Sequence, residues 1–161
     1  HILPCTNTNL KHSDLNCITP QTLAKCLDGH YNHLIDKLII IDSRYPYEYE
    51  GGHIRSAHNI FTKERIIEMF LTNKEDILKK NDKQKRIVII FHCEFSSERG
   101  PSMLRFLRNQ DRAANRDHYP KLFYPELYLL EGGYKAFYEQ HSVSLKQFIM
   151  KTIKKKKNFP K

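Results

Sequence analysis

Two short, uninterrupted apolar runs constrain the fold of this chain more than any other feature. They are Leu38–Ile41, which Asp42 closes, and Ile87–Phe91, and both are rich in β-branched residues. A continuous run of this length is typical of a strand buried on both faces, as the strands of parallel sheets are. Both runs fall far short of the roughly 20 residues that span a bilayer, so we expect no transmembrane helix and no membrane partner.

Weaker patterns place helices and further strands around these runs. Thr19 and Pro20 resemble the start of a helix that ends near residue 29, and a helical pattern also follows Pro101. Further strands are predicted at 57–60 and 127–130, the first followed by a helical stretch through residue 71. Residues 44–53 are expected to be a loop, and 73–85 a helix end followed by a loop. Alternating strands and helices imply right-handed βαβ units, so we predict an α/β, three-layer sandwich with a central, mostly parallel sheet of about five strands.

The length of 161 residues fits one domain. We find no repeat or linker inside 15–140 and assign that range to the domain. Residues 1–14 are expected to be a mobile N-terminal extension, and 141–161 a basic C-terminal helix or tail. The chain begins with His1 and shows no signal-peptide pattern, which indicates an excised piece of a longer protein.

The basic charge belongs to the C-terminal end. The net charge is +9, but 142–161 contain seven lysines and no acid, which leaves +2 for the rest of the chain. Such a block is usually a solvated end, and less often a nuclear-import signal or a patch that attracts anionic partners. We favour the solvated end and expect no nucleic-acid partner.

The four cysteines are not arranged as a metal site or a disulfide framework. Cys5, Cys17, Cys26 and Cys93 show no close pairs and no ligand-like spacing with the nine histidines. A reducing compartment and no bound metal are therefore expected. Cys26 has the pattern of a small buried hydrophobe, and Cys5 falls in the expected extension.

Cys93 lies in a different context, on the turn between a predicted strand and a predicted helix. At the carboxyl edge of an open α/β sheet, loop amides and a helix N-terminus point into one crevice, which favours anions. The five residues between Cys93 and Arg99 are enough for the backbone to wrap around a tetrahedral phosphate while the guanidinium holds two oxygens. The same donors would stabilise a thiolate, so we predict a nucleophilic cysteine in a phosphate cradle.

This segment resembles the active-site loop of the M-phase inducer phosphatases, dual-specificity enzymes of the rhodanese fold. The resemblance runs from Ile18 to Tyr138 and rests on His92 to Pro101, the tyrosine-rich stretch 41–54, Asp111-Arg112, 119–122, 124–128 and Gly132-Gly133-Tyr134. It implies dephosphorylation of neighbouring phosphothreonine and phosphotyrosine in cyclin-dependent kinases, which promotes passage from G2 into mitosis. It also implies no cofactor, a kinase–cyclin complex as the protein partner, a monomer, and a place in the nucleus and cytoplasm.

The resemblance also assigns roles. Cys93 would attack phosphorus to give a phosphocysteine, and the phosphate would be bound by the backbone of Glu94, Phe95, Ser96, Ser97, Glu98 and Arg99 with the Arg99 guanidinium. The chain has no tryptophan, so the Trp-Pro-Asp acid loop of other cysteine phosphatases is absent. Glu98 is the first candidate general acid and Glu94 the second. Either could instead hold the loop, and a substrate monoanion could bring its own proton.

Other residues carry weaker expectations. Arg108, Arg112 and Tyr119 match positions with which the family docks its kinase, although composition alone would make the arginines a solvated stripe. We expect His92 to orient the loop by hydrogen bonding and Asp42 to pair with a nearby arginine.

The chain departs from the family at two places. Ser43 occupies a position where the family usually has a cysteine that can form a disulfide with the nucleophile. We predict that peroxide oxidises Cys93 beyond sulfenic acid more readily here, which mass spectrometry can test. The sequence after Gln140 also loses register with the family, which weakens any docking through that end.

Three other functions remain open. A rhodanese-type sulfurtransferase has the same fold and a cysteine, with a loop that is typically shorter, and a phosphatase-like arsenate reductase is a further enzyme. A rhodanese-like domain that binds phosphoproteins without turnover belongs to another class, which the presence of both Cys93 and Arg99 disfavours.

Overall fold

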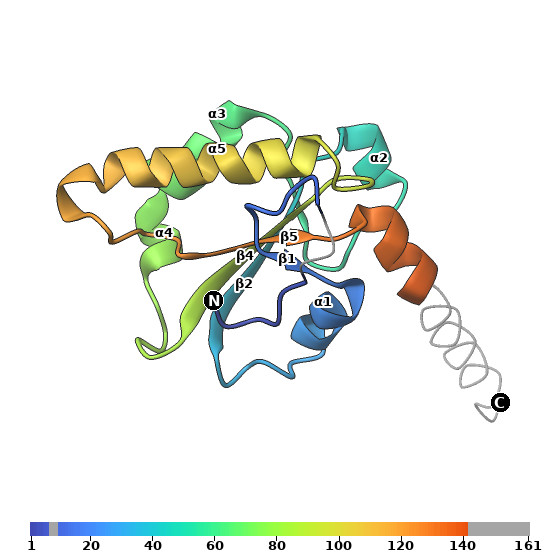
Figure 1. Ribbon diagram of the computed structural model, residues 1–161, viewed down its shortest axis with the longest axis horizontal. Helices are drawn as coiled ribbons and strands as arrows, with labels where there is room; N and C mark the ends of the chain where they lie inside the picture. The colour runs from blue at the N-terminus through green and yellow to red at the C-terminus, as the bar shows by residue number, and fades with distance from the viewer. Residues whose placement is uncertain (7–9, 142–161) are drawn as a thin grey trace, which may run out of the picture.

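A parallel five-stranded sheet runs through the centre of the computed structural model, which describes residues 1–6 and 10–141 (Figure 1). The strands are β1 (Cys17–Ile18), β2 (Ile35–Asp42), β3 (His58–Asn59), β4 (Arg86–His92) and β5 (Glu126–Leu130). Their order across the sheet is β1-β5-β4-β2-β3, and every neighbouring pair is parallel. The predicted α/β sandwich is confirmed.

Helices cover both faces of this sheet (Figure 1). The long α5 (Arg99–Ala114) lies over one face with α3 (Lys63–Ile67), the π-helical turn η1 (Glu68–Thr72) and α4 (Lys74–Leu78). On the other face lie α1 (Pro20–Leu27) and the helical residues 133–141. Short pieces complete the chain, α2 (Pro46–Glu50) after β2 and the 3-10 turn η2 (Arg116–His118) after α5. None of the helices in the described part of the chain is long and apolar enough to span a membrane.

The central strand β4 shows why the apolar runs are continuous. Ile87, Ile89 and Phe91 pack on the face beneath α5, whereas Val88 and Ile90 pack on the opposite face near α1. Since alternate side chains of a strand point to opposite faces, a sheet covered on both sides needs apolar residues at every position. Each of these five side chains is at most 5% exposed, which confirms the prediction of a buried strand at 87–91. In the other predicted run, residues 39–41 are buried and Leu38 is partly buried.

The sheet brings the carboxyl ends of β2 and β4 together. Asp42, the last residue of β2, pairs in register with His92, the last residue of β4. The chain turns directly from β4 into α5, so the predicted phosphate loop lies at the edge where Asp42 and the segment after it also lie. This geometry places two polar segments that are about 50 residues apart beside each other.

The first residues differ from their prediction as a mobile extension, since the described part of 1–14 is packed on the domain. Leu3 is 1% exposed and its amide donates to the Tyr128 hydroxyl at 3.1 Å, while Thr6 forms an antiparallel bridge with Cys17. The bridge lies beside β1, at one edge of the sheet, where pairing satisfies exposed backbone groups. The basic tail, 142–161, lies outside the described residues.

Candidate active site

The loop between β4 and α5 is fixed on both sides by glycine contacts. A Cβ atom on Gly100 would lie 3.1–3.2 Å from backbone atoms of His92 and Cys93. A Cβ on Gly133, whose φ is +64°, would lie 2.5–2.6 Å from the carbonyl oxygens of Cys93 and Glu94. Only glycine fits at position 133, and a side chain at position 100 would need the backbone of His92 and Cys93 to shift by a few tenths of an ångström. The loop therefore sits directly against α5 and the helix that starts at residue 133.

The helix that begins at residue 133 holds the carbonyl side of the loop. The Tyr134 amide donates to the Cys93 carbonyl at 2.9 Å, and the Lys135 amide donates to the Glu94 carbonyl at 3.0 Å. In a trans peptide the N–H points away from the C=O of the same unit. The amides of Glu94 and Phe95 therefore point away from that helix.

The six amides that follow Cys93 have no hydrogen-bond acceptor in the part of the chain that the structure describes. Within the described chain, no backbone N–H from residue 94 to residue 99 donates to a protein acceptor. Ser96 adopts a left-handed φ of 53°, which reverses the backbone halfway along the loop. Successive free amides in a chain reversal at a helix N-terminus form an anion-binding concavity. Cys93, 3% exposed, lies at its start.

A charge cluster built on the buried pair of Asp42 and Arg44 supports the loop from β2. This inner cluster consists of Asp42, Arg44 and Glu94. Arg44 donates to both Asp42 carboxylate oxygens, the shortest bond being 2.8 Å, and to Glu94 at 3.1 Å. Burial alone would lower the pKa of Arg44, but the hydrogen bonds and charges of Asp42 and Glu94 outweigh it and raise that pKa. The expected ion pair of Asp42 with a nearby arginine is confirmed.

Arg44 makes two further contacts within the protein. Its Nη2 donates to the Gly52 carbonyl at 2.7 Å, and the Tyr134 ring stacks 4.1 Å from its guanidinium carbon. With 3% of its side chain exposed, Arg44 is fully occupied by protein partners. It therefore serves the loop as a structural support and is not available to a ligand.

His92 lies beneath this cluster and is completely buried. Its Nδ1 donates to the Cys93 carbonyl at 3.0 Å, while its Nε2 has no hydrogen-bond partner and lies 3.9 Å from Asp42. Burial lowers the pKa of His92 and keeps the ring neutral. The bond to Cys93 agrees with the expected role of His92 in orienting the loop.

Arg99 forms a more exposed pair with Glu48, and these two residues make up the outer pair. Its guanidinium donates to both Glu48 oxygens, at 2.7 and 3.1 Å, and lies 5.2 Å from the centre of the Tyr45 ring. The Arg99 side chain is 35% exposed. The hydrogen bond from Arg99 lowers the pKa of Glu48. Sequence reasoning missed Glu48, which α2 places in a stretch expected to be loop.

The two candidate acids have different surroundings. Glu94 belongs to the inner cluster, where its carboxylate accepts a hydrogen bond from Arg44 at 3.1 Å. Glu98 occupies the N-cap position of α5, is exposed, and contacts no charged or hydrogen-bonding side chain of the described residues. A carboxyl group that is not held by an arginine can turn toward a leaving group, so the geometry favours Glu98.

The other described thiols have a different environment from a nucleophile. Cys17 and Cys26 are buried in the core, and burial raises the pKa of each thiol to about 11. Both are protonated at neutral pH, in agreement with the expectation for Cys26. All four cysteines are free, and Ser43 is buried with its hydroxyl unpaired. The predicted redox sensitivity of Cys93 stays a prediction.

The family model for the rhodanese-like domain matches residues 24–140. The chain belongs to the rhodanese-like domain family. M-phase inducer phosphatase 1-B of Xenopus laevis is 53% identical over 131 residues, and M-phase inducer phosphatase of Drosophila melanogaster is 51% identical over 135. These matches cover 81% of this chain but 23% and 28% of the relatives, so the chain spans about a quarter of their length. The sequence resemblance to the M-phase inducer phosphatases is confirmed.

A solved structure supports the rhodanese-like fold independently. The As-Sb reductase of Leishmania major superposes with a TM-score of 0.59 over 78% of each chain, at 24% identity. At this identity the likeness concerns the fold alone. The predicted rhodanese-like sandwich is confirmed.

The expected docking residues lie apart from the loop of this rhodanese-like domain. Arg112 and Tyr119 are exposed, Tyr119 by 88%, and they lie at and beyond the carboxyl end of α5. Arg108 donates to the carbonyls of Tyr124 and Pro125 at 3.1 and 3.4 Å, and burial lowers its pKa. Arg108 is therefore partly committed to the loop before β5, whereas Arg112 and Tyr119 are open to a partner.

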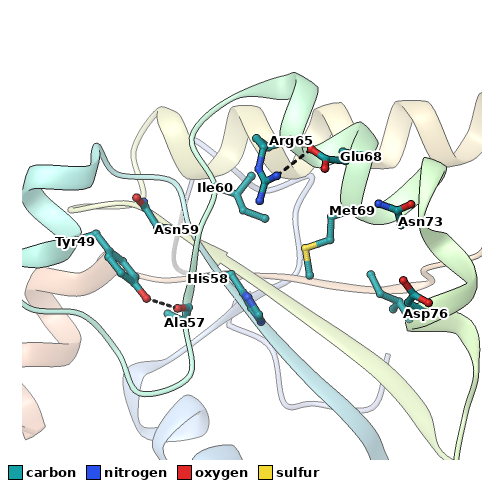
Figure 2. Close-up of a pocket in the computed structure, with 11 residues that line it drawn as sticks. Tyr49, Ala57, His58, Asn59, Ile60, Arg65, Glu68, Met69, Asn73 and Asp76 are labelled. Atoms are coloured by element: carbon teal, nitrogen blue, oxygen red, sulfur yellow. Dashed lines mark hydrogen bonds and ion pairs between the residues drawn. The ribbon is translucent and has the colours of Figure 1, made fainter.

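A separate pocket of about 480 Å³ lies beside the edge strand β3 (Figure 2). Its walls include His58 and Met69, and an ion pair of 2.9 Å joins Arg65 to Glu68 on α3 and η1. No residue from 92 to 101 lines it. This pocket is therefore not part of the loop site.

Proposed function

We propose that this rhodanese-like domain is the catalytic domain of a dual-specificity protein phosphatase that works through a phosphocysteine on Cys93. The observation that carries the proposal is the row of six amides, 94–99, that have no acceptor among the described residues and directly follow a buried cysteine. A phosphoryl group in transfer spreads its charge over three equatorial oxygens, and preorganised donors stabilise that charge. The identity to M-phase inducer phosphatases supports the same reaction.

The reaction has two steps. The Cys93 sulfur attacks phosphorus in line, an S–P bond forms, and the bond from phosphorus to the tyrosine or threonine oxygen breaks. Glu98 gives its proton to the leaving oxygen. A water molecule then gives a proton to the Glu98 carboxylate and attacks phosphorus. An O–P bond forms and the S–P bond breaks, which releases inorganic phosphate and restores both the thiolate and the protonated Glu98.

Arg99 changes partner during this cycle. Its guanidinium is bound to Glu48 in the free protein, and a phosphate in the loop competes for the same two-pronged geometry. The Arg99 side chain, which is 35% exposed, has room for this exchange, whereas Arg44, at 3%, does not.

We propose cyclin-dependent kinases in complex with cyclins as the protein substrate, with phosphotyrosine and phosphothreonine as the groups removed. The names of the relatives support a role in entry into M phase. Exposed Arg112 and Tyr119 offer docking side chains at a distance from the loop. We further propose that the protein acts as a monomer in the nucleus and cytoplasm.

One assay tests the function. Hydrolysis of a small aryl phosphate and sulfur transfer from thiosulfate are measured for the wild type, for Cys93→Ser and for the matched control Cys26→Ser. We expect aryl phosphatase activity that only Cys93→Ser abolishes. Absence of that activity in the wild type, or its survival in Cys93→Ser, contradicts the proposal, and thiosulfate turnover in its place identifies a sulfurtransferase.

The choice of phosphoprotein substrate is tested separately. Kinase–cyclin complex carrying both phosphates is offered to the wild type and to Arg112→Ala. We expect Arg112→Ala to slow release of phosphate from the complex and to leave aryl phosphate turnover unchanged. Equal rates on the complex would remove Arg112 from the docking surface.

A further inference from the structure

A hydrogen-bonded chain links the N-terminal segment to the middle of the phosphate loop. Arg105 of α5 donates to both oxygens of Asp14, at 2.8 and 3.0 Å, and its Nη2 also lies 3.0 Å from Nδ1 of His12. The other ring nitrogen of His12, Nε2, lies 2.8 Å from the Ser97 carbonyl oxygen. His12 is 5% exposed, so it is held firmly in this chain.

The two partners fix which nitrogen of His12 carries the proton. A guanidinium can only donate, so Nδ1 must accept from Arg105. A carbonyl oxygen can only accept, so Nε2 must carry the hydrogen and donate it to Ser97. Arg105, which Asp14 in turn orients, therefore sets the tautomer that His12 needs in order to hold the loop.

Ser97 needs this donor because the helix cannot supply one. The carbonyl of Glu98 accepts from the Ser102 amide in the first turn of α5, at 2.9 Å. The equivalent donor for Ser97 would be residue 101, which is a proline and has no N–H. Among the described residues, His12 is the donor that replaces it.

Holding this carbonyl orients an amide of the cradle. Ser97 C=O and Glu98 N–H belong to one planar trans peptide and point in opposite directions. Because the Ser97 carbonyl is hydrogen-bonded to His12, the Glu98 amide of the same peptide points away from His12. A pocket of about 490 Å³ borders His12 and Ser97 at this place, so little else packs against the peptide.

We propose that His12 is a positioning residue for phosphoryl transfer, which fixes the peptide between Ser97 and Glu98 so that the Glu98 amide can bind a phosphate oxygen. The inference rests on the phosphatase function proposed above. Its anion-binding part can be measured without turnover, so the two can fail separately.

The test compares His12→Ala, His12→Gln and the wild type in two assays. These are kcat and KM for an aryl phosphate, and the affinity for sodium tungstate, a tetrahedral oxyanion, by calorimetry. Since loss of one oxyanion donor costs about 100- to 1,000-fold, a misdirected donor in His12→Ala should lower kcat by about 10- to 100-fold and weaken tungstate binding by at least threefold. Glutamine can donate and accept like the wild-type ring, so His12→Gln should recover most of both losses.

Asn115→Ala controls for lost stability. Asn115 is also 5% exposed and binds Asp111 at the far end of α5, away from the loop. We expect this variant to lose stability and to keep wild-type kcat and tungstate affinity. Unchanged tungstate affinity in His12→Ala, or losses in His12→Gln as large as those in His12→Ala, would overturn the inference. A wild type that binds tungstate without hydrolysing aryl phosphate would refute the phosphatase function and leave the role of His12 in anion binding standing.

Discussion

The inner cluster and the outer pair each place an arginine against carboxylates beside the same loop, yet they are built differently. Arg44 is 3% exposed and has Asp42, Glu94, the Gly52 carbonyl and a tyrosine ring as partners. Arg99 is 35% exposed and has one carboxylate and one ring. The comparison teaches that an arginine next to a phosphate loop serves the fold when its donors are used up inside the protein. It serves the ligand when its ion pair is open to exchange.

The largest effect is expected from breaking the inner cluster. Arg44→Met leaves the Asp42 carboxylate buried without its cation, which should lower the free energy of unfolding by about 3–5 kcal/mol. Arg99→Met should lower it by less than about 1 kcal/mol, because exposed ion pairs contribute little. Urea denaturation of both variants measures the difference. Equal losses in the free energy of unfolding for the two variants would contradict the view that Arg44 supports the fold and Arg99 does not.

Changes to the outer pair should have a large effect on activity and a small effect on stability. Arg99→Lys keeps the charge but loses the planar fork, and we expect kcat/KM for an aryl phosphate to fall about 100-fold. The free energy of unfolding should change by less than about 1 kcal/mol. Steady-state kinetics at neutral pH, with the unfolding curve as control, provide the test. Wild-type kcat/KM in Arg99→Lys would mean that the fork does not contact phosphate.

Burial beside the inner cluster should also oppose a positive charge on His92. Burial lowers the pKa of His92 below its ordinary value of about 6.5, so the unfolded chain binds this proton before the folded protein does. Stability is therefore fully present above pH 6.5 and is lost as the pH falls below it. At pH 5.5 the wild type should therefore have lost stability that a variant without this imidazole keeps. Urea denaturation at pH 7.5 and 5.5 should show a smaller pH effect in His92→Gln, and an equal effect in both proteins contradicts the prediction.

The smallest effect is expected from freeing Arg99. Glu48→Gln removes the carboxylate that competes with phosphate, so tungstate should bind about threefold tighter at pH 7, as expected for loss of a partly exposed competing charge. Calorimetry measures this change, and Tyr47→Phe, on the exposed side of α2, serves as a control. Weaker binding in Glu48→Gln would mean that Glu48 holds Arg99 in its binding position instead of competing for it.

The parts of this protein that could be predicted from sequence are local in the chain. The strands around residues 38–41 and 87–91 are continuous apolar runs, and the loop from Cys93 to Arg99 is one contiguous segment. The contacts that were missed join distant residues. Glu48 reaches Arg99 across 51 positions, and His12 reaches Ser97 across 85.

The short elements were missed for a related reason. Strand β1 has two residues and α2 has five, which is too few for an apolar period to appear. The proline at position 101 was a sequence feature that could have pointed to His12. It marks a loop carbonyl that needs a donor from elsewhere, but nothing in the sequence names that donor.

A crystal structure of the wild-type domain grown with sodium tungstate tests the central claim most directly. The account predicts one tungstate ion beside the Cys93 sulfur, its oxygens within hydrogen-bond distance of the amides of residues 94 to 99, with the Arg99 guanidinium moved from Glu48 onto the anion. Tungstate bound elsewhere, or a loop whose amides turn away from the ion while Arg99 stays on Glu48, would contradict it.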